Sequence, residues 1–362
     1  MNGEDYIQIK PDFFLKGMYI DSDIFYVQNG KAVLFCQQAI ITEEKINKLK
    51  AISESNAPIF VSKQGYIFLM QQYESIKNIN EEQAKNYRKT KDMFAKQAEE
   101  IRRTGKVDTK QSEMLADMVN ETLDRAELSY IVQWVSYMRD TDEYLCTHSV
   151  NVSMLNGMMG KWLGLSTEEE KKLVLAGLLH DIGKVKIAEE IINKPGKLTK
   201  EEYEIVKRHP LFSYDILMSS GIKDEEILSG ARGHHEKGNG SGYPDGLVLD
   251  KISLFARVTA ISDIYDAMVA KRAYKDACSP FQVLDEFYKN KFSDLDIRLV
   301  DIFLDRMAND MIGRDAVLSD GRMGKIVFID KDNIAYPVVK SGDEIIYTTF
   351  NLRCEALCTG IR

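Results

Sequence analysis

The sequence predicts a mainly helical protein with a small α+β domain at the N-terminus and a short β segment at the C-terminus. Residues 109 to about 310 carry apolar residues at helical spacing, interrupted by Gly and Pro turns. The first 78 residues and those beyond 311 instead alternate short β-branched or aromatic runs with tight-turn signals. We therefore expect four parts: an accessory domain at 1–78, a helical linker at 79–127, a helical catalytic domain at 128–310 and a β domain at 311–362.

Individual elements follow from local signals. Asn29-Gly30 is a hairpin turn between strands near 18–27 and 32–35, and further strands are expected at 59–61 and 66–69. Thr42 is placed to cap a short helix that carries Ile46 and Leu49. Residues 80–104, rich in Lys, Glu, Gln and Arg, predict an exposed connecting helix that Gly105 interrupts; such a helix could also pair with its twin in a homodimer. Beyond 311, strands are expected at 316–318, 325–329 and 337–339, with a turn at Asp320-Gly321.

Composition and charge exclude several classes of protein. The formal net charge of -8 argues against a binder of DNA or RNA polymers, which needs a basic face. No apolar run approaches the roughly 20 residues of a membrane helix, and the first residues lack a basic, apolar signal segment. Five widely spaced cysteines do not suggest a disulfide framework. We therefore expect a cytoplasmic protein that needs no membrane.

The histidines are the most informative residues. There are only five in 362 residues, and all lie between His148 and His235. Imidazole nitrogens and carboxylate oxygens together suit divalent metals such as Fe, Mn, Zn or Ni. A metal site built from histidine and carboxylate is the resulting hypothesis.

Helical periodicity directs these groups toward one interior. A capping box of Ser166 and Glu169 opens a helix whose apolar stripe ends at His180. A second capping box, Thr199 with Glu202, opens a helix expected to run through His209 and to end at Pro210. Two further helical faces carry one ligand each. His148 lies among apolar residues on one face, and Asp263 lies among small alanines on the other.

A cation is the simplest reason to bury so many polar groups together. Any one of these histidines alone is more often a hydrogen-bonded core residue, but burying all of them without a cation would cost several kcal/mol. Seven ligands also exceed the need of one ion that keeps open sites, which favours two metals bridged by Asp181. The seven expected ligands are His148, His180, Asp181, His209, His234, His235 and Asp263.

Several motifs in this region resemble one known family. They are His180-Asp181-x-Gly183-Lys184, His234-His235-Glu236, the stretch Gly238 to Leu247 that contains Gly242-Tyr243-Pro244, Asp263-x-x-Asp266-Ala267-Met268 and Arg272-x-x-Lys275. Together they resemble the HD-GYP family of cyclic di-GMP phosphodiesterases over roughly residues 128 to 310. The resemblance implies an all-helical core of the HD phosphohydrolase type.

The resemblance also implies roles for single residues. One metal would be held by His148, His180, Asp181 and Asp263. The other would be held by Asp181, His209, His234 and His235. Asp181 and Lys184 would act in catalysis, and substrate contacts would come from Lys184, Tyr243, Arg272 and Lys275. Two divalent ions are expected, either iron or manganese.

The function expected from these features is metal-dependent hydrolysis of cyclic di-GMP to linear pGpG, in bacterial second-messenger signalling, and the sequence leaves open whether the end product is pGpG or GMP. Three alternatives stay open from the sequence. The protein could bind a cyclic dinucleotide as a signalling or scaffold protein without turnover. It could hydrolyse 3′,3′-cyclic GMP-AMP instead, or it could act on a mononucleotide or an alarmone, against which the Gly-Tyr-Pro segment and Arg272 argue.

Overall fold

A computed structural model describes most of the chain and divides it into two compact units. The first unit comprises Met1–Glu82, Lys275–Asp285 and Ala308–Arg362, and the second comprises Gln83–Tyr274 and Glu286–Met307. The described residues are 6–14, 18–20, 23–28, 30–37, 39–125, 144–194, 196–273, 280–289, 294–320, 322–330 and 333–357. The domain boundaries expected at residues 78, 127 and 310 remain predictions.

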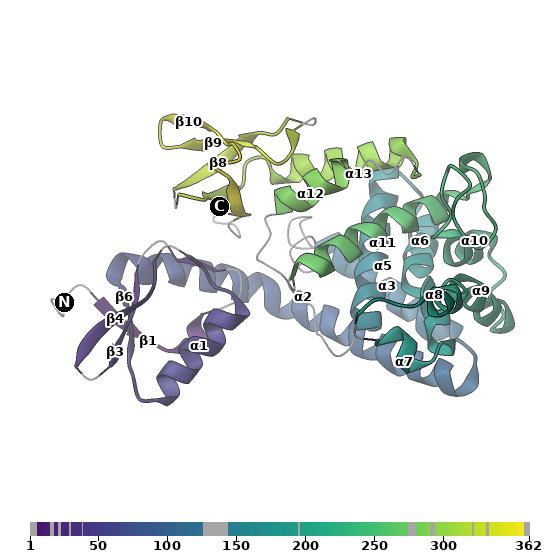
Figure 1. The fold of residues 1–362 in the computed structure, drawn as a ribbon, viewed down its shortest axis with the longest axis horizontal. Helices are drawn as coiled ribbons and strands as arrows, with labels where there is room; N and C mark the ends of the chain where they lie inside the picture. The colour runs from purple at the N-terminus through teal and green to yellow at the C-terminus, as the bar shows by residue number, and fades with distance from the viewer. Residues whose placement is uncertain are drawn as a thin grey trace. The chain divides into compact units, whose positions relative to one another are not determined.

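The N-terminal part contains a four-stranded antiparallel sheet in the order β1-β6-β3-β4 (Figure 1). The expected hairpin is confirmed, because β3 pairs with β4 and Gly30 between them has φ +72°. Thr42 accepts a hydrogen bond from the Lys45 amide at the start of α1, which confirms the predicted cap. The elements are β1 (Tyr6–Ile9), a 3-10 turn η1 (Pro11–Phe13), β2 (Tyr19–Ile20), β3 (Ile24–Gln28), β4 (Lys31–Cys36), β5 (Ala39–Ile40), α1 (Glu43–Glu54) and β6 (Ile59–Ser62).

Helix α2 (Lys63–Thr104) differs from the sequence predictions in two respects. The strand expected at 66–69 is wrong, because these residues form the first turns of α2. The Ser62 hydroxyl accepts a hydrogen bond from the Gly65 amide, and the three-residue spacing of Tyr66 and Leu69 places both against the N-terminal core. The second half of α2 is also less exposed than expected, because Tyr87 and Phe94 are fully buried.

The C-terminal part is a five-stranded antiparallel sheet in the order β10-β9-β8-β7-β11. The three strands expected from the sequence are present, and two more complete the sheet. Their bounds are β7 (Asp315–Leu318), β8 (Met323–Phe328), β9 (Val338–Ser341), β10 (Glu344–Tyr347) and β11 (Cys354–Leu357).

The second unit is helical, as predicted. Helices α5 and α6 form its centre, and Gly177 lets them approach, since a Cβ atom there would lie 2.9 Å from the Cα of Ser153 on α5. The helices that lie wholly in this unit are α3 (Thr109–Arg125), α5 (Tyr144–Leu163), α6 (Thr167–Leu179), α7 (Glu189–Ile192), α8 (Lys200–Val206), α9 (His209–Ser219), α10 (Glu225–Gly233) and α11 (Leu254–Ala273), with 3-10 turns η2 (Ile182–Lys186) and η3 (Leu249–Lys251). Helices α12 (Pro280–Lys289) and α13 (Ile297–Met311) each have residues in both units.

Both predicted capping boxes are present, at the starts of α6 and α8. The expected end of the second helix is wrong, because α8 stops at Val206 and His209-Pro210 begins a new helix, α9. Proline fits the first turn of a helix, where its missing N–H has no intrahelical partner. His209 therefore takes its position from the start of α9. Within the described residues, no helix is long and apolar enough to cross a membrane.

Candidate metal centre

The structure brings all seven expected metal ligands together inside the helical unit. His148 lies on α5, His180 and Asp181 follow the last residue of α6, and His209 begins α9. His234 and His235 follow α10, and Asp263 lies on α11. Their ligand atoms form three groups, and the atoms of each group lie within 4.8 Å of one another. The groups are His148, His180 and Asp263; His209, His234 and His235; and His180, Asp181 and His234.

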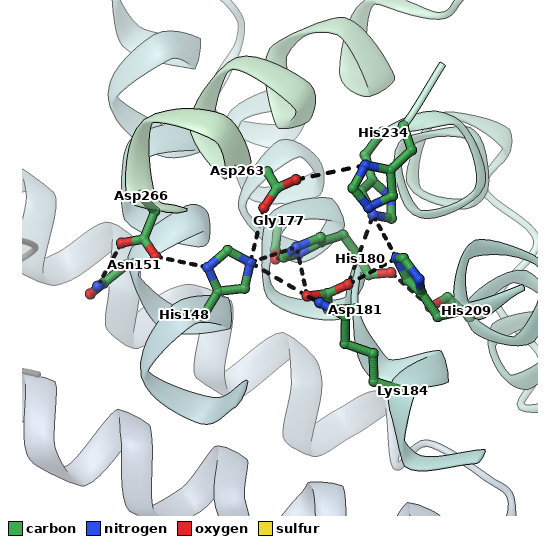
Figure 2. A network of polar contacts seen from close by, with 12 residues as sticks. His148, Asn151, Gly177, His180, Asp181, Lys184, His209, His234, Asp263 and Asp266 are labelled. Atoms are coloured by element: carbon green, nitrogen blue, oxygen red, sulfur yellow. Dashed lines mark hydrogen bonds and ion pairs between the residues drawn. The ribbon is translucent and has the colours of Figure 1, made fainter. Parts of the chain in front are cut away.

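Asp181 lies between the first two groups (Figure 2). Its Oδ2 atom is 3.4 Å from Nε2 of both His148 and His180. Its Oδ1 atom is 3.1 Å from Nε2 of His209 and 3.8 Å from Nε2 of His234. Each carboxylate oxygen therefore faces a different set of histidines, which is the arrangement that a bridging ligand requires.

Asp263 also spans the cluster. Its Oδ1 atom is 3.1 Å from Nε2 of His148, and its Oδ2 atom is 3.9 Å from Nδ1 of His235. The small-residue face of α11 around it includes Ala256 and Ala260, both buried, and Gly233 on α10 packs against Ala256. This close packing of α10 on α11 places Asp263 near the histidine pair.

Hydrogen bonds orient four of the five imidazole rings. The Nδ1 atoms of His180, His209 and His234 each donate to the carbonyl oxygen three residues earlier, of Gly177, Val206 and Ala231, at 2.6, 2.7 and 2.8 Å. Nδ1 of His148 donates to Oδ2 of Asp266 at 2.7 Å. Because a carbonyl or carboxylate oxygen can only accept, these bonds place the proton on Nδ1 and leave the Nε2 lone pair for the cluster.

The resulting arrangement fits metal ions. Nε2 of His180 lies 3.2 Å from Nε2 of His148, and Nε2 of His209 lies 3.2 Å from Nε2 of His234, so lone pairs face one another. Within the described residues, the buried Oδ1 atom of Asp181 has no hydrogen-bond partner. Facing lone pairs and a buried carboxylate oxygen without a donor are stabilised by a cation. The cluster is therefore able to hold divalent metal ions.

Electrostatics in the cluster favour charged carboxylates. Burial opposes the charge of Asp181, yet Lys184 and the histidines around it hold its pKa well below the ordinary range. The pKa of Asp263 is lowered in the same way, against its burial, by His148 and His235. Both aspartates are therefore available as anionic ligands at neutral pH.

The histidines of the cluster differ from one another in pKa. Burial opposes the charged form of His148, but its three aspartate partners raise its pKa well above the usual value. A metal ion at Nε2 would take the place of the proton that these carboxylates favour there. Burial and the neighbouring imidazoles hold the pKa of His234 well below that value. Burial also lowers the pKa of His235, to about 3. Both members of the pair are therefore neutral, as metal ligands must be.

Residues expected to contact substrate lie partly at this cluster. Lys184 forms an ion pair with Oδ2 of Asp181 and is 21% exposed. The ring of Tyr243 lies 4.7 Å from the ring of His235, at an interplanar angle of 31°. Burial raises the pKa of Tyr243, so this tyrosine stays neutral. Arg272 lies near the end of α11, but its side chain is not described, and Lys275 lies outside the described residues.

The Gly-Tyr-Pro loop is held against the histidine pair by backbone contacts. The Tyr243 amide donates to the carbonyl oxygen of His235 at 3.1 Å. A Cβ atom at Gly242 would lie 2.6 Å from that same oxygen and 2.6 Å from the Cα of Glu236, so only glycine fits. The carboxylate of Glu236 accepts hydrogen bonds from the amides of Asp245 and Leu247 at 2.6 and 2.8 Å.

Sequence reasoning did not assign roles to several residues around the cluster. Asp266 holds His148, and Ser213 on α9 donates to the carbonyl oxygen of His180 at 2.7 Å. The Lys207 ammonium lies 5.5 Å from the centre of the Tyr203 ring and 5.9 Å from that of Tyr243. Asp266 could have been found from its position three residues after Asp263, one helical turn away. Ser213 and Lys207 carry no such signal.

The helical part of the chain is similar to known proteins. Residues 111–299, just over half of the chain, match the family model described as HD domain. The response regulator RpfG of Xanthomonas campestris, a cyclic di-GMP phosphodiesterase, is 39% identical over 189 residues, or 51% of this chain and 48% of that protein. The cyclic di-GMP phosphodiesterase PdeB of Borreliella burgdorferi is 30% identical over 206 residues, or 56% of this chain and 54% of that protein.

Other relatives differ in the substrate that they are named for. The 3′3′-cGAMP-specific phosphodiesterase 2 of Vibrio cholerae is 36% identical over 159 residues, or 44% of this chain and 30% of that protein. A solved structure, the HDG"Y"P protein Bd1817 of Bdellovibrio bacteriovorus, matches with a TM-score of 0.50 and 17% identity, covering 84% of this chain and 99% of that one. This likeness supports the fold.

The matched region is the one that contains the cluster. The chain spans about half the length of RpfG and PdeB. All seven expected ligands and the Gly-Tyr-Pro loop lie between residues 148 and 263, inside the matched range 111–299. The resemblance seen in the sequence is confirmed, and the chain belongs to the HD domain family.

Proposed function

We propose that this protein is a metal-dependent phosphodiesterase that hydrolyses cyclic di-GMP to linear pGpG and onward to GMP. The observation that carries the proposal is the position of Asp181, whose two carboxylate oxygens face two separate groups of histidines. One ion would require only one of these groups. A pair of ions bridged by a carboxylate is a common design for hydrolysing phosphodiesters.

Each ion would have its own set of ligands. His148, His180, Asp181 and Asp263 would hold the first ion, and Asp181, His209, His234 and His235 the second. Bound divalent ions supply positive charge for the phosphate oxygens and lower the pKa of a water molecule. Nitrogen and oxygen ligands without thiolate suit iron or manganese, which we propose as the native metals.

The chain's own residues bind and orient the substrate in this proposal. Lys184, which lies beside Asp181, offsets negative charge on the phosphoryl oxygens during reaction. Tyr243 offers a neutral aromatic face for a base directly beside His235. Arg272 and Lys275 bind the phosphates, and Lys207 adds a cation beside the Tyr243 ring.

Location and assembly are also proposals. We propose a cytoplasmic protein that acts on a small nucleotide, without a nucleic-acid polymer or membrane as partner, in line with the net charge of -8. A homodimer through α2 would use the surface of that helix away from Tyr87 and Phe94, because both of these residues are buried within the chain.

The second candidate function is hydrolysis of 3′,3′-cyclic GMP-AMP. It is favoured by the similarity to the cGAMP-specific enzyme of Vibrio cholerae. The two candidates share the metal centre and differ only in the recognition of one base. Binding without turnover is the third candidate, and the complete ligand set argues against it.

One experiment separates these candidates. The protein is purified without oxygen, loaded with Fe(II) or Mn(II), and incubated separately with cyclic di-GMP and 3′,3′-cyclic GMP-AMP, and the products are separated by chromatography. We expect two ions per chain and faster release of pGpG and GMP from cyclic di-GMP. Faster cleavage of the mixed dinucleotide would establish the second candidate. A protein with two ions that cleaves neither substrate would contradict both enzymatic proposals.

A further inference from the structure

A chain of buried hydrogen bonds connects the metal cluster to helix α2. Asp266 on α11 accepts a hydrogen bond from Nδ1 of His148 through Oδ2, at 2.7 Å, and Figure 2 shows the pair beside Asn151. Oδ1 of Asp266 accepts from Nδ2 of Asn151 at 2.9 Å. Oδ1 of Asn151 in turn accepts from the hydroxyl of Tyr87 on α2 at 2.8 Å.

The direction of every bond in this chain is determined by chemistry. A carboxylate can only accept, so Asp266 requires a donor from both His148 and Asn151. The Asn151 amide must therefore point its nitrogen at Asp266 and its oxygen away from it. That oxygen can only accept, so the Tyr87 hydroxyl donates to it.

Burial makes the loss of any of these hydrogen bonds costly. Tyr87 is 1% exposed, His148 is 2% exposed, and both Asn151 and Asp266 are fully buried. Water therefore cannot easily replace a lost partner, and a buried polar atom left without a bond is costly. Removing the hydroxyl of Tyr87 would take away the hydrogen bond that orients the oxygen of the Asn151 amide.

We propose that Tyr87 is a positioning residue of the metal centre, an inference that rests on the proposed function. It acts through Asn151 and Asp266 to hold the ring of His148 in the tautomer and orientation that direct Nε2 toward the metal. Hydrogen-bond partners behind a metal-ligating histidine commonly determine its tautomer and its basicity as a ligand. Tyr87 is connected to His148 through two intervening side chains, Asn151 and Asp266.

The position of Tyr87 in the chain extends the proposal. Tyr87 lies on α2, which begins at Lys63, directly after strand β6 of the N-terminal sheet. His148 is the ligand on α5, so a shift of α2 against α5 would act first on the bond between Tyr87 and Asn151. The affinity for the ion on His148 therefore depends on the placement of the part of α2 that belongs to the helical unit, from Gln83 to Thr104.

The other three oriented histidines provide an internal comparison. His180, His209 and His234 donate to carbonyl oxygens three residues earlier, at the end of α6, before α9 and at the end of α10. These bonds do not depend on Tyr87. Loss of the Tyr87 hydroxyl should therefore affect the ion on His148 and spare the ion held by His209, His234 and His235.

The test uses the full chain in three forms: wild type, Tyr87→Phe and the control Thr90→Val. Thr90 lies one turn further along α2 and is equally buried, and its hydroxyl donates to the carbonyl oxygen of Asn86 on the same helix. Metal-free protein is titrated with Mn(II) and followed by calorimetry. Low-temperature electron paramagnetic resonance separates isolated Mn(II) from a spin-coupled pair.

We expect wild type and Thr90→Val to bind two ions and to give the coupled signal. Tyr87→Phe should bind one ion with unchanged affinity and the other about tenfold more weakly, with an isolated Mn(II) signal at intermediate metal. Asp266→Asn, one bond closer to His148, should lose up to about 100-fold at the same ion.

The outcomes separate this inference from the proposed function. If wild type binds fewer than two ions, the proposed two-metal enzyme is wrong. If wild type binds two ions and Tyr87→Phe matches Thr90→Val, Tyr87 has no positioning role. Equal weakening of both ions in Tyr87→Phe would show a general loss of packing and would also overturn the inference.

Discussion

Gly183 packs directly against the backbone of His209. A Cβ atom at Gly183 would overlap the carbonyl oxygen of His209 and would lie 2.5 Å from the amide nitrogen of Ser213. The Gly183 amide also donates to the Ser213 hydroxyl at 2.8 Å. This contact joins η2, which follows Asp181, to α9, which begins at His209, and so determines the distance between these two ligands.

We therefore expect Gly183→Ala to separate Asp181 from His209. The added methyl group meets backbone atoms that cannot move independently, and overpacking of this kind typically costs about 1–3 kcal/mol of stability. Urea unfolding should show the loss, and metal analysis should show fewer than two ions per chain. Gly160→Ala on α5 is the matched control, because its Cβ atom would meet the movable Glu170 side chain at 3.2 Å. Equal stability and metal content in both variants would contradict this prediction.

Asp181→Asn should remove turnover and disturb both ions. The amide keeps the size of the side chain but loses the negative charge, and only one of its two heavy atoms can then act as an acceptor toward the histidine groups. Elemental analysis of protein purified without oxygen measures the effect. A variant that keeps two ions and full activity would show that Asp181 does not bridge them.

Lys184→Ala should retain both ions and lose rate. Lys184 contacts the substrate phosphate in our proposal, and removal of one donor to a developing phosphoryl charge typically costs about 10²- to 10³-fold in kcat. Single-turnover kinetics on metal-loaded protein measure this step separately from product release. Unchanged kcat with two bound ions would exclude Lys184 from catalysis.

Glu236→Gln should loosen the Gly-Tyr-Pro loop without removing metal. The carboxylate accepts from two amides, of Asp245 and Leu247, whereas a glutamine nitrogen would face one of these N–H groups as a second donor. Because Tyr243 lies in this loop, we expect a raised KM and faster hydrogen exchange over residues 239–249. Asp250→Asn, at an exposed acid in η3, is the control. If Glu236→Gln instead lost an ion, Glu236 would be a ligand and this account of the loop would be wrong.

Arg272→Ala and Lys275→Ala should weaken binding of cyclic di-GMP and leave the metal content unchanged. An acidic chain needs a local group of cations to hold a ligand with two phosphates. The effect should shrink as salt rises, because exposed charges are screened beyond about 8 Å at physiological ionic strength. Calorimetry with a metal-loaded, slowly reacting variant at low and high salt measures both effects. Equal affinity in wild type and both variants would show that these residues do not bind the phosphates and are solvent-exposed residues at a helix end.

The sequence by itself determined the kinds of ligand and most of the helices that carry them. Capping boxes at Ser166 and Thr199 depend on residues only three positions apart, so the start of each helix could be predicted. The clustering of all histidines between 148 and 235 indicated a metal site without any knowledge of the fold. The hairpin around Gly30 was predictable for the same reason, since its turn is local.

Only the tertiary structure decided which atoms meet. His148 and Asp266 are separated by 118 residues, and no spacing rule predicts that their side chains bond. The same holds for Tyr87 and Asn151, which join two helices far apart in the sequence. The strand predicted at residues 66–69 was wrong, because a short apolar run is compatible with either strand or helix and packing of Tyr66 and Leu69 on the N-terminal core favoured the helix. Local patterns encode the elements, whereas packing between distant elements places Asp181 between its two groups of histidines.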